Sequence, residues 1–112
     1  MGGVYLADAL STYRLVLDRD AGNVEALQGL CDVMILLKNL DEALKFARLI
    51  LGLDSENYKA EASLGWIHFL KKEYQEAVSC LQSAISKNGN APNLYRLGKV
   101  YWAMGGMHLS QY

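Results

Sequence analysis

Hydrophobic residues recur along this chain at the spacing of amphipathic helices, and short polar runs separate the apolar stretches. Between residues 62 and 70, Leu64, Ile67 and His68 fall on one stripe at i, i+3 and i+4, which is one face of an α-helix. Residues 71–73 are polar and predict a turn. The next stretch, 74–85, carries a second helical stripe made by Tyr74, Ala77, Leu81, Ala84 and Ile85. The pattern predicts two helices joined by a short turn.

This helix pair is one copy of a motif that repeats about every 34 residues. The asparagines Asn23, Asn57 and Asn90 are separated by steps of 34 and 33 residues, and one residue is missing near 88–90. Two further columns keep their chemical class at the same steps, namely Leu30, Leu64 and Leu97; and Cys31, Gly65 and Gly98. Four more do so at two steps of 34, namely Ala9, Ala43 and Ala77; Leu6, Leu40 and Tyr74; Val16, Ile50 and Ala84; and Leu17, Leu51 and Ile85. A period of this length fits two helices of about 13 residues and two short turns.

Polar residues mark where the helices begin. Each repeated asparagine precedes a first helix, where its side-chain oxygen can accept a hydrogen bond from an unpaired backbone N–H. Asp41 and Glu42 stand at the start of a second helix, where negative charge is favourable beside the helix dipole. The chain has a single proline, Pro92, and such scarcity is typical of long helices. We therefore expect an all-α protein.

The stretch from residue 64 to residue 84 resembles the tetratricopeptide repeat (TPR), whose pattern is Leu-Gly, an aromatic residue, Ala, a leucine or aromatic residue, and Ala. The matching residues are Leu64, Gly65, Tyr74, Ala77, Leu81 and Ala84. Residues 97–101 are similar to the first half of the pattern, and 24–57 form a looser copy. The proline that usually ends a repeat is replaced by Ala21, Ser55 and Gly89.

The resemblance implies an α-solenoid of antiparallel helix pairs, wound into a right-handed superhelix of about six helices. Residues 1–112 then form one domain: 4–21 is the second helix of a partial repeat, 24–57 and 58–90 are full repeats, and 91–112 is a partial repeat. In the last segment, 91–104 is a first helix, Gly105 and Gly106 form the turn, and 107–112 start a second helix. We expect such an array to belong to a longer superhelix or to need a neighbour at its ends. Residues 97–102 also resemble the long TPR scaffold of an RNA-decay complex.

Small residues are expected where helices approach each other most closely, because a larger side chain would hold their axes apart. The first helix of each pair carries one column of such residues, and the second helix carries another. One more small residue is expected where the second helix contacts the next repeat. These structural repeat positions are Cys31, Gly65 and Gly98; Ala43 and Ala77; and Ala84.

The first helices of successive TPRs line a concave groove, and in the family the ligand contacts come mainly from their second, fifth, ninth and twelfth positions. The resemblance places there Glu25, Gln28, Asp32 and Ile35 from the first full repeat, Lys59, Ala62, Trp66 and Phe69 from the second, and Tyr95, Lys99 and Trp102, beside Arg96, from the last. Aromatic side chains on this face are natural anchors for a bound segment. The alternative is that they pack against a neighbouring helix inside the fold.

Some TPR proteins bind the carboxylate tail of a chaperone through a clamp of Lys, Asn, Asn, Lys and Arg. The corresponding positions here are Gln28, Asp32, Ser63, Pro92 and Arg96 or its neighbours, and only the arginine fits. Because Asp32 would repel a carboxylate, we expect a mixed apolar and basic partner segment. The chain is accordingly predicted to be a protein-binding adaptor within a multi-protein assembly. The alternatives are a structural module that self-associates through open repeat ends, and a helical-repeat scaffold associated with RNA.

Charge and composition argue against several other classes of protein. The 11 basic and 12 acidic residues give a net charge of −1, so direct binding to nucleic-acid phosphates is disfavoured. No apolar run reaches the roughly 18 residues that a membrane span needs, and the N-terminus lacks the pattern of a secretory signal. We therefore expect a location in the cytoplasm or the nucleus, with no membrane partner and no small-molecule substrate.

Candidate groups for chemistry are few. Cys31 and Cys80 lie 49 residues apart without a metal-ligand spacing, and we expect two reduced, buried thiols. His68 occupies a position where an aromatic residue usually packs, and His108 stands near the C-terminus, so a four-ligand zinc site is not expected. No nucleophile, base and orienting acid can be combined. The sequence predicts no enzyme, no catalytic residue, no metal and no cofactor.

Overall fold

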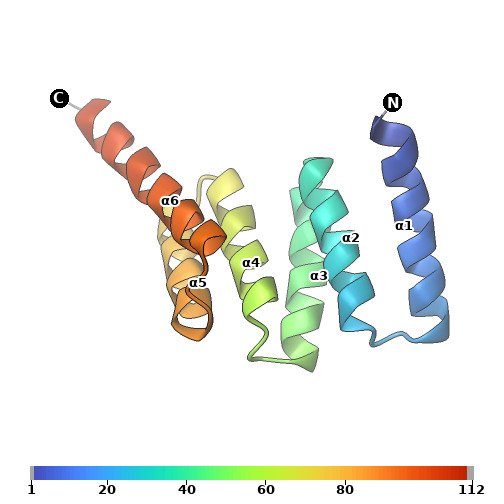
Figure 1. Cartoon of the computed structure of the whole chain (residues 1–112). Helices are drawn as coiled ribbons and strands as arrows, with labels where there is room; N and C mark the ends of the chain where they lie inside the picture. The colour runs from blue at the N-terminus through green and yellow to red at the C-terminus, as the bar shows by residue number, and fades with distance from the viewer. Residues whose placement is uncertain (1, 111–112) are drawn as a thin grey trace.

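The computed structural model of the chain describes the backbone of residues 2–110 and the side chains of residues 5–106. Over this range it contains no strand and six helices, which are α1 (Gly2–Arg19), α2 (Val24–Leu36), α3 (Leu40–Leu53), α4 (Tyr58–Leu70), α5 (Tyr74–Lys87) and α6 (Ala91–Ser110). Each helix runs antiparallel to the one before it (Figure 1). The predicted all-α solenoid of helix pairs is confirmed.

The repeated asparagines cap the first helix of each pair. Each side-chain Oδ1 accepts a hydrogen bond from the backbone N–H three residues later, at 2.9 Å for Asn23, 2.9 Å for Asn57 and 3.0 Å for Asn90. Since the first N–H groups of a helix have no partner within it, these bonds fix the starts of α2, α4 and α6. Asp41 and Glu42 lie in the first turn of α3, where they face the positive end of the helix dipole.

The turns within the two full helix pairs share one backbone conformation. Lys38 and Lys72, which occupy equivalent positions 34 residues apart, have positive φ angles of 62° and 65°. A left-handed residue just beyond the end of a helix satisfies its last carbonyl groups and reverses the chain. As a result α3 packs along α2, and α5 packs along α4.

The contacts between helices arrange them in two layers. The helices α2, α4 and α6 contact one another in succession, whereas α1, α3 and α5 make no contact with one another over the described residues. The molecule is elongated, with extents of 54 × 34 × 22 Å. Because its helices lie closer together, the layer of α2, α4 and α6 is the inner, concave side of the array.

The interior follows the columns of small residues. Cys31, Ala43, Ala77 and Ala84 have no exposed surface, and Gly65 is buried between α4 and α5. The Cys31 thiol donates a hydrogen bond to the carbonyl oxygen of Ala43 at 3.4 Å, which reflects the close approach of α2 and α3. Larger side chains at these positions would separate the helix axes.

Gly98 differs from the other members of its column. It is exposed, and a β-carbon built on it would meet nothing within 4 Å. Among the described elements only α4 and α5 pack against α6, and neither covers this position. The prediction of a close helix contact at Gly98 is therefore wrong, because a small residue marks such a contact only where a second helix is present.

The end of α6 also departs from the prediction. The sequence predicts a turn at Gly105 and Gly106 and a new helix in 107–112, but α6 runs without a break through both glycines to Ser110. Gly105 stands at the position of Lys38 and Lys72, where the reversed chain gains the packing of α3 or α5. No described helix offers such packing after α6, so continued helical hydrogen bonding is favoured. Residues 111–112, the rest of the predicted helix, lie outside the described part of the chain.

Candidate binding groove

The inner layer contains a hollow of about 230 Å³ where α2, α4 and α6 meet. Its lining residues are Gln28 and Asp32 from α2; Tyr58, Lys59, Ala62 and Ser63 from α4; and Asn90, Pro92, Asn93 and Arg96 at the start of α6. Five of the residues predicted for the concave face are thus brought together by three helices, namely Gln28, Asp32, Lys59, Ala62 and Arg96.

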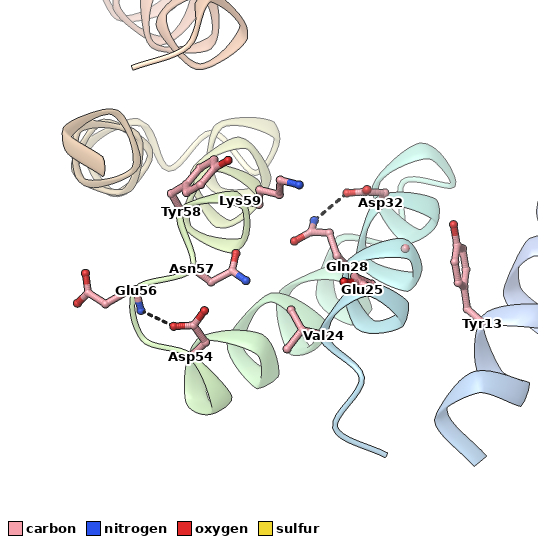
Figure 2. A pocket seen from close by; sticks show the side chains of 11 residues that line it. Tyr13, Val24, Glu25, Gln28, Asp32, Asp54, Glu56, Asn57, Tyr58 and Lys59 are labelled. Carbon is pink, nitrogen blue, oxygen red and sulfur yellow. Dashed lines mark hydrogen bonds between the residues drawn. The ribbon is translucent and has the colours of Figure 1, made fainter. Parts of the chain in front are cut away.

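A larger hollow of about 630 Å³ adjoins it on the side of α2 (Figure 2). Four carboxylates line this hollow, those of Glu25, Asp32, Asp54 and Glu56, together with a single cation, Lys59. Figure 2 shows Lys59 on α4 facing Gln28 and Asp32 on α2. This end of the groove is therefore predominantly acidic, and it is electrostatically complementary to a basic side chain.

Gln28 connects α2 to α4 across the floor of the groove. Its Nε2 donates hydrogen bonds to Asp32 Oδ1 at 3.0 Å and to Ser63 Oγ at 2.9 Å. Its Oε1 is buried and accepts no hydrogen bond from a described residue. The bond to Ser63 fixes the spacing of the two helices, and it holds the Asp32 carboxylate at the edge of the hollow.

The other end of the groove combines aromatic rings with cations. Trp66 stacks on Phe69, with ring centroids 4.8 Å apart and planes at 25°. The Arg96 guanidinium lies 5.8 Å from the Trp66 ring centroid, which is within the range of a cation–π contact. Arg96 Nη1 also donates to Asn93 Oδ1 at 3.4 Å. Trp66 is thus half-buried between Phe69 and a cation of the groove.

Phe69 belongs more to the interior than to the groove. Its ring lies 5.8 Å from that of Tyr74, and it packs against the buried cluster that α4, α5 and α6 share. The sequence left two alternatives open for the aromatic residues, anchoring a ligand or packing against a neighbouring helix. Phe69 packs against neighbouring helices inside the fold. Phe69 therefore stacks on Trp66 and links it to the interior of the fold.

Tyr95, Lys99 and Trp102 line a separate hollow of about 440 Å³ on α6, with Gly98 at its base. Tyr95 is 67% exposed and Trp102 is 78% exposed. Lys99 Nζ lies 5.8 Å from the Tyr95 ring centroid. These three predicted residues share one face of α6, but they do not join Gln28 and Asp32 in the central hollow.

Two of the lining residues that were not among the predicted groove contacts, Ser63 and Asn93, make hydrogen bonds to predicted ones. Ser63 anchors Gln28, and Asn93 is a buried polar residue, 3% exposed, that meets Arg96. Asn93 could have been found from the repeat, because its equivalents 33 and 67 residues earlier are Ala60 and Ala26. A polar residue in a column of buried alanines indicates a polar neighbour.

The cysteine and histidine side chains considered as candidates for chemistry have structural surroundings. Burial, together with the charge of Asp32, raises the pKa of the Cys31 thiol to about 12, so the thiolate that a nucleophile requires is strongly disfavoured. His68 Nδ1 lies 2.9 Å from Glu73 Oε1 at the turn between α4 and α5, and this hydrogen bond lowers the pKa of the Glu73 carboxyl. Over residues 5–106, no three metal-ligating side chains gather at one point.

No described helix combines the length and apolarity needed to cross a membrane.

Comparison with known sequences identifies the repeats. Two profiles of the tetratricopeptide repeat match residues 6–58 and 62–88. Human Superkiller complex protein 3 is 34% identical over 88 residues, which are 77% of this chain and 6% of that protein. The chain thus corresponds to a small part of that relative.

Solved structures share the arrangement of helices. MamA is 33% identical, with a TM-score of 0.77 over 89% of this chain and 59% of its own. The first TPR of Spaghetti (RPAP3), bound to the HSP90 peptide SRMEEVD, has a TM-score of 0.83 at 19% identity and covers 93% of this chain and 83% of its own. At 19% identity, the similarity to the Spaghetti domain shows a shared fold and nothing more.

Proposed function

Since this chain belongs to the tetratricopeptide-repeat family, we propose that it is a protein-binding scaffold and not an enzyme. Its inner layer would hold a segment of a partner protein across α2, α4 and α6. In keeping with the name of the human relative, which is a component of a complex, we propose that the chain works within a multi-protein assembly in the cytoplasm or the nucleus.

The observation that carries this proposal is the division of charge and aromatic surface along the inner layer. At the α2 end, four carboxylates surround the larger hollow. At the α6 end, Arg96 and Lys99 lie against aromatic rings, and neither forms an ion pair within the described part of the chain. Of the four carboxylates, only Glu56 forms an ion pair with a described residue, Lys87 at 3.5 Å. Charges of opposite sign at the two ends of the inner layer favour a partner segment with the complementary order of charges.

The partner segment that fits best is mixed in character. A lysine or arginine would lie near Asp32 and Glu25, and an apolar side chain flanked by a carboxylate would lie near Trp102 and Lys99. Trp102 is the stronger anchor because most of its large ring is exposed, so its burial by a partner would contribute most. A tail with several carboxylates, such as the peptide SRMEEVD bound by the Spaghetti domain, fits the α2 end poorly because Asp32 would repel it.

Site-specific photo-crosslinking tests the location of the bound segment. The photoreactive residue p-benzoylphenylalanine would replace Tyr95, which is exposed on the inner side, or Ser79, which is exposed on α5 in the outer layer. We expect a partner to be captured in cells from position 95 and identified by mass spectrometry, with little capture from position 79. Equal capture of that partner from both positions would contradict binding in the groove.

Affinity measurements on that partner test the anchor. Trp102→Ala should weaken binding about 30-fold, which corresponds to about 2 kcal/mol, as the loss of an anchor residue does. The matched control is Tyr5→Ala, which removes an aromatic side chain that is 76% exposed on α1, and it should leave the dissociation constant unchanged. If the two variants bind equally well, the α6 end is not part of the site.

A second candidate function, self-association, is favoured by the exposed apolar residues of α1. Tyr5 is 76% exposed and Leu15 is 58% exposed, although α1 contacts only α2 among the described helices. Sedimentation velocity from low to high micromolar concentration would detect the association of copies through this face. Self-association that Tyr5→Lys combined with Leu15→Lys abolishes would support this candidate, and a monomer at every concentration would exclude it.

A further inference from the structure

A hollow of about 750 Å³ lies on the outer side of the first full repeat, apart from the groove. Its lining residues are Ala21, Gly22, Leu27, Lys45, Arg48, Leu49, Gly52 and Leu53. None of them lines the hollows of the inner layer. The connection from α1 to α2 and the C-terminal end of α3, which form its two sides, lie at the same end of the helices (Figure 1).

The walls of this hollow are apolar and in contact with solvent. Leu27 is buried, with 4% exposure, and forms the base. Leu49 and Leu53 project from successive turns of α3 and are 54% and 58% exposed. Contiguous exposed apolar surface with a charged rim is typical of a contact site for another molecule.

The second repeat indicates that the helix pair does not require this apolar surface. The equivalents of Leu27, Leu49 and Leu53, 34 residues later, are Glu61, Ser83 and Lys87. These three polar residues are bonded to one another: Lys87 Nζ lies 2.5 Å from Glu61 Oε1, and the Ser83 hydroxyl donates to Glu61 Oε2.

The same place on the same scaffold is therefore closed by a polar network in one repeat and left open and apolar in the other. The remaining equivalents agree with this contrast, since Arg48 and Lys45 correspond to the uncharged Gln82 and Ser79. Because the helix pair of the second repeat folds in the same way with polar residues there, the apolar hollow of the first repeat is a local feature that the fold itself does not explain.

The charged residues of the hollow determine what could occupy it. Lys45 and Arg48 are its only charged lining residues, and both are cations. Arg48 forms no ion pair with a described residue, and Lys45 has the exposed, local partner Glu42 at 3.3 Å. Ion pairs of that kind are weak in water, so both cations remain available to carboxylates of a ligand.

We propose that this hollow is a second protein-binding site, which receives a leucine- or phenylalanine-sized side chain of a partner segment while acidic residues beside it pair with Lys45 and Arg48. The site would let the scaffold hold one partner in the groove and another on its outer face. It uses none of the groove residues, so its test is independent of the function proposed for the groove.

Peptide selection with a designed counter-target tests this proposal. A displayed library of random twelve-residue peptides is first depleted on Leu49→Ser/Leu53→Lys, which carries the residues that the second repeat has at these exposed positions, and is then selected on the wild-type chain. We expect enriched peptides to combine a leucine or phenylalanine with aspartates or glutamates. Synthetic versions should bind the wild type at least tenfold more tightly than they bind Leu49→Ser/Leu53→Lys or the rim variant Lys45→Glu/Arg48→Glu.

The matched control is Leu36→Ser/Leu37→Lys, because these two leucines are also exposed, at 66% and 45%, but lie outside the hollow. It should bind the selected peptides like the wild type, and circular dichroism should show that every variant is folded. Failure to enrich any peptide, or peptides that bind all variants equally, would overturn the proposal. Enriched peptides without acidic residues would overturn the proposed partner chemistry, and a dimer dissociated by Leu49→Ser/Leu53→Lys would assign the hollow to a second copy instead.

Discussion

Gly65 in α4 lies so close to Leu81 in α5 that a β-carbon on the glycine would stand 2.9 Å from Leu81 Cγ. The same β-carbon would be 3.2 Å from Cys80 Cβ and 3.3 Å from the carbonyl oxygen of Ala77. The backbone of α5 blocks one side, so the two helices can adopt this spacing only with a glycine at position 65. Gly98, at the equivalent position of α6, has open space instead.

This contrast predicts opposite effects of one substitution at two equivalent positions. Gly65→Leu should overpack the interface of α4 and α5 and lower the free energy of unfolding by about 1–3 kcal/mol or more. Gly98→Leu should raise it by up to about 1 kcal/mol, because leucine is a better helix former than glycine and meets no neighbour. Urea denaturation of both variants measures the difference. Similar losses at both positions would mean that a further helix covers Gly98.

A second prediction concerns Tyr13 in α1, whose ring occupies the space that a β-carbon on Gly29 in α2 would need. Alanine is a better helix former than glycine by up to about 1 kcal/mol. Gly29→Ala should nevertheless not raise the free energy of unfolding, because its β-carbon would displace the Tyr13 ring. In a Tyr13→Ala background the same substitution should stabilise the chain by about that amount. A double-mutant cycle by urea denaturation measures the coupling between the two sites. Equal effects of Gly29→Ala in both backgrounds would show that α1 does not pack against α2 in this way.

A third prediction tests the continuity of α6. If Gly105 is helical, Gly105→Ala should raise the free energy of unfolding by up to about 1 kcal/mol and increase the helical signal in circular dichroism. If Gly105 instead adopts the left-handed conformation of Lys38 and Lys72, alanine should cost about 1–2 kcal/mol. The sign of the change in a urea titration distinguishes the two, and Cα chemical shifts of residues 103–107 give an independent measure of helix.

A fourth prediction follows from the Cys31 thiol, whose pKa burial raises to about 12. The unfolded chain releases this proton near the ordinary cysteine pKa of about 8.5. The stabilising effect of the protonated thiol is thus fully present below that pH and is lost as the pH rises towards the folded pKa. Above pH 9, the free energy of unfolding should fall more steeply in the wild type than in Cys31→Ala, by as much as about 1.4 kcal/mol per pH unit.

Urea denaturation of both proteins at pH 7, 8, 9 and 10 gives this difference. Tyrosines and lysines also titrate in alkaline solution, but they are common to both proteins and cancel in the comparison. Alanine also leaves a small cavity, which adds a constant offset and no slope. Parallel pH profiles for wild type and variant would contradict a buried, protonated thiol at position 31.

The sequence by itself determined the helices and their pairing. The signals for helices are amphipathic spacing, the three asparagines and the acidic residues at the start of α3. They act through contacts between residues a few positions apart, so the sequence alone is enough to predict them. The caps at Asn23, Asn57 and Asn90 accordingly lie where the repeat predicts them. The groove position of Gln28, Asp32 and Lys59 was implied by the resemblance to the TPR, and all three line the central hollow.

Only the tertiary structure decided which surfaces are covered. Gly65 and Gly98 look alike in the sequence, yet one is enclosed by α5 and the other is open. Trp66 and Phe69 lie on the same predicted face, but Phe69 packs into the cluster shared with α5 and α6 while Trp66 meets Arg96. Leu49 and Leu53 are apolar residues of α3 and are nevertheless exposed beside a hollow. In each case burial depends on whether another helix stands opposite, and that relation between distant parts of the chain is not contained in local spacing.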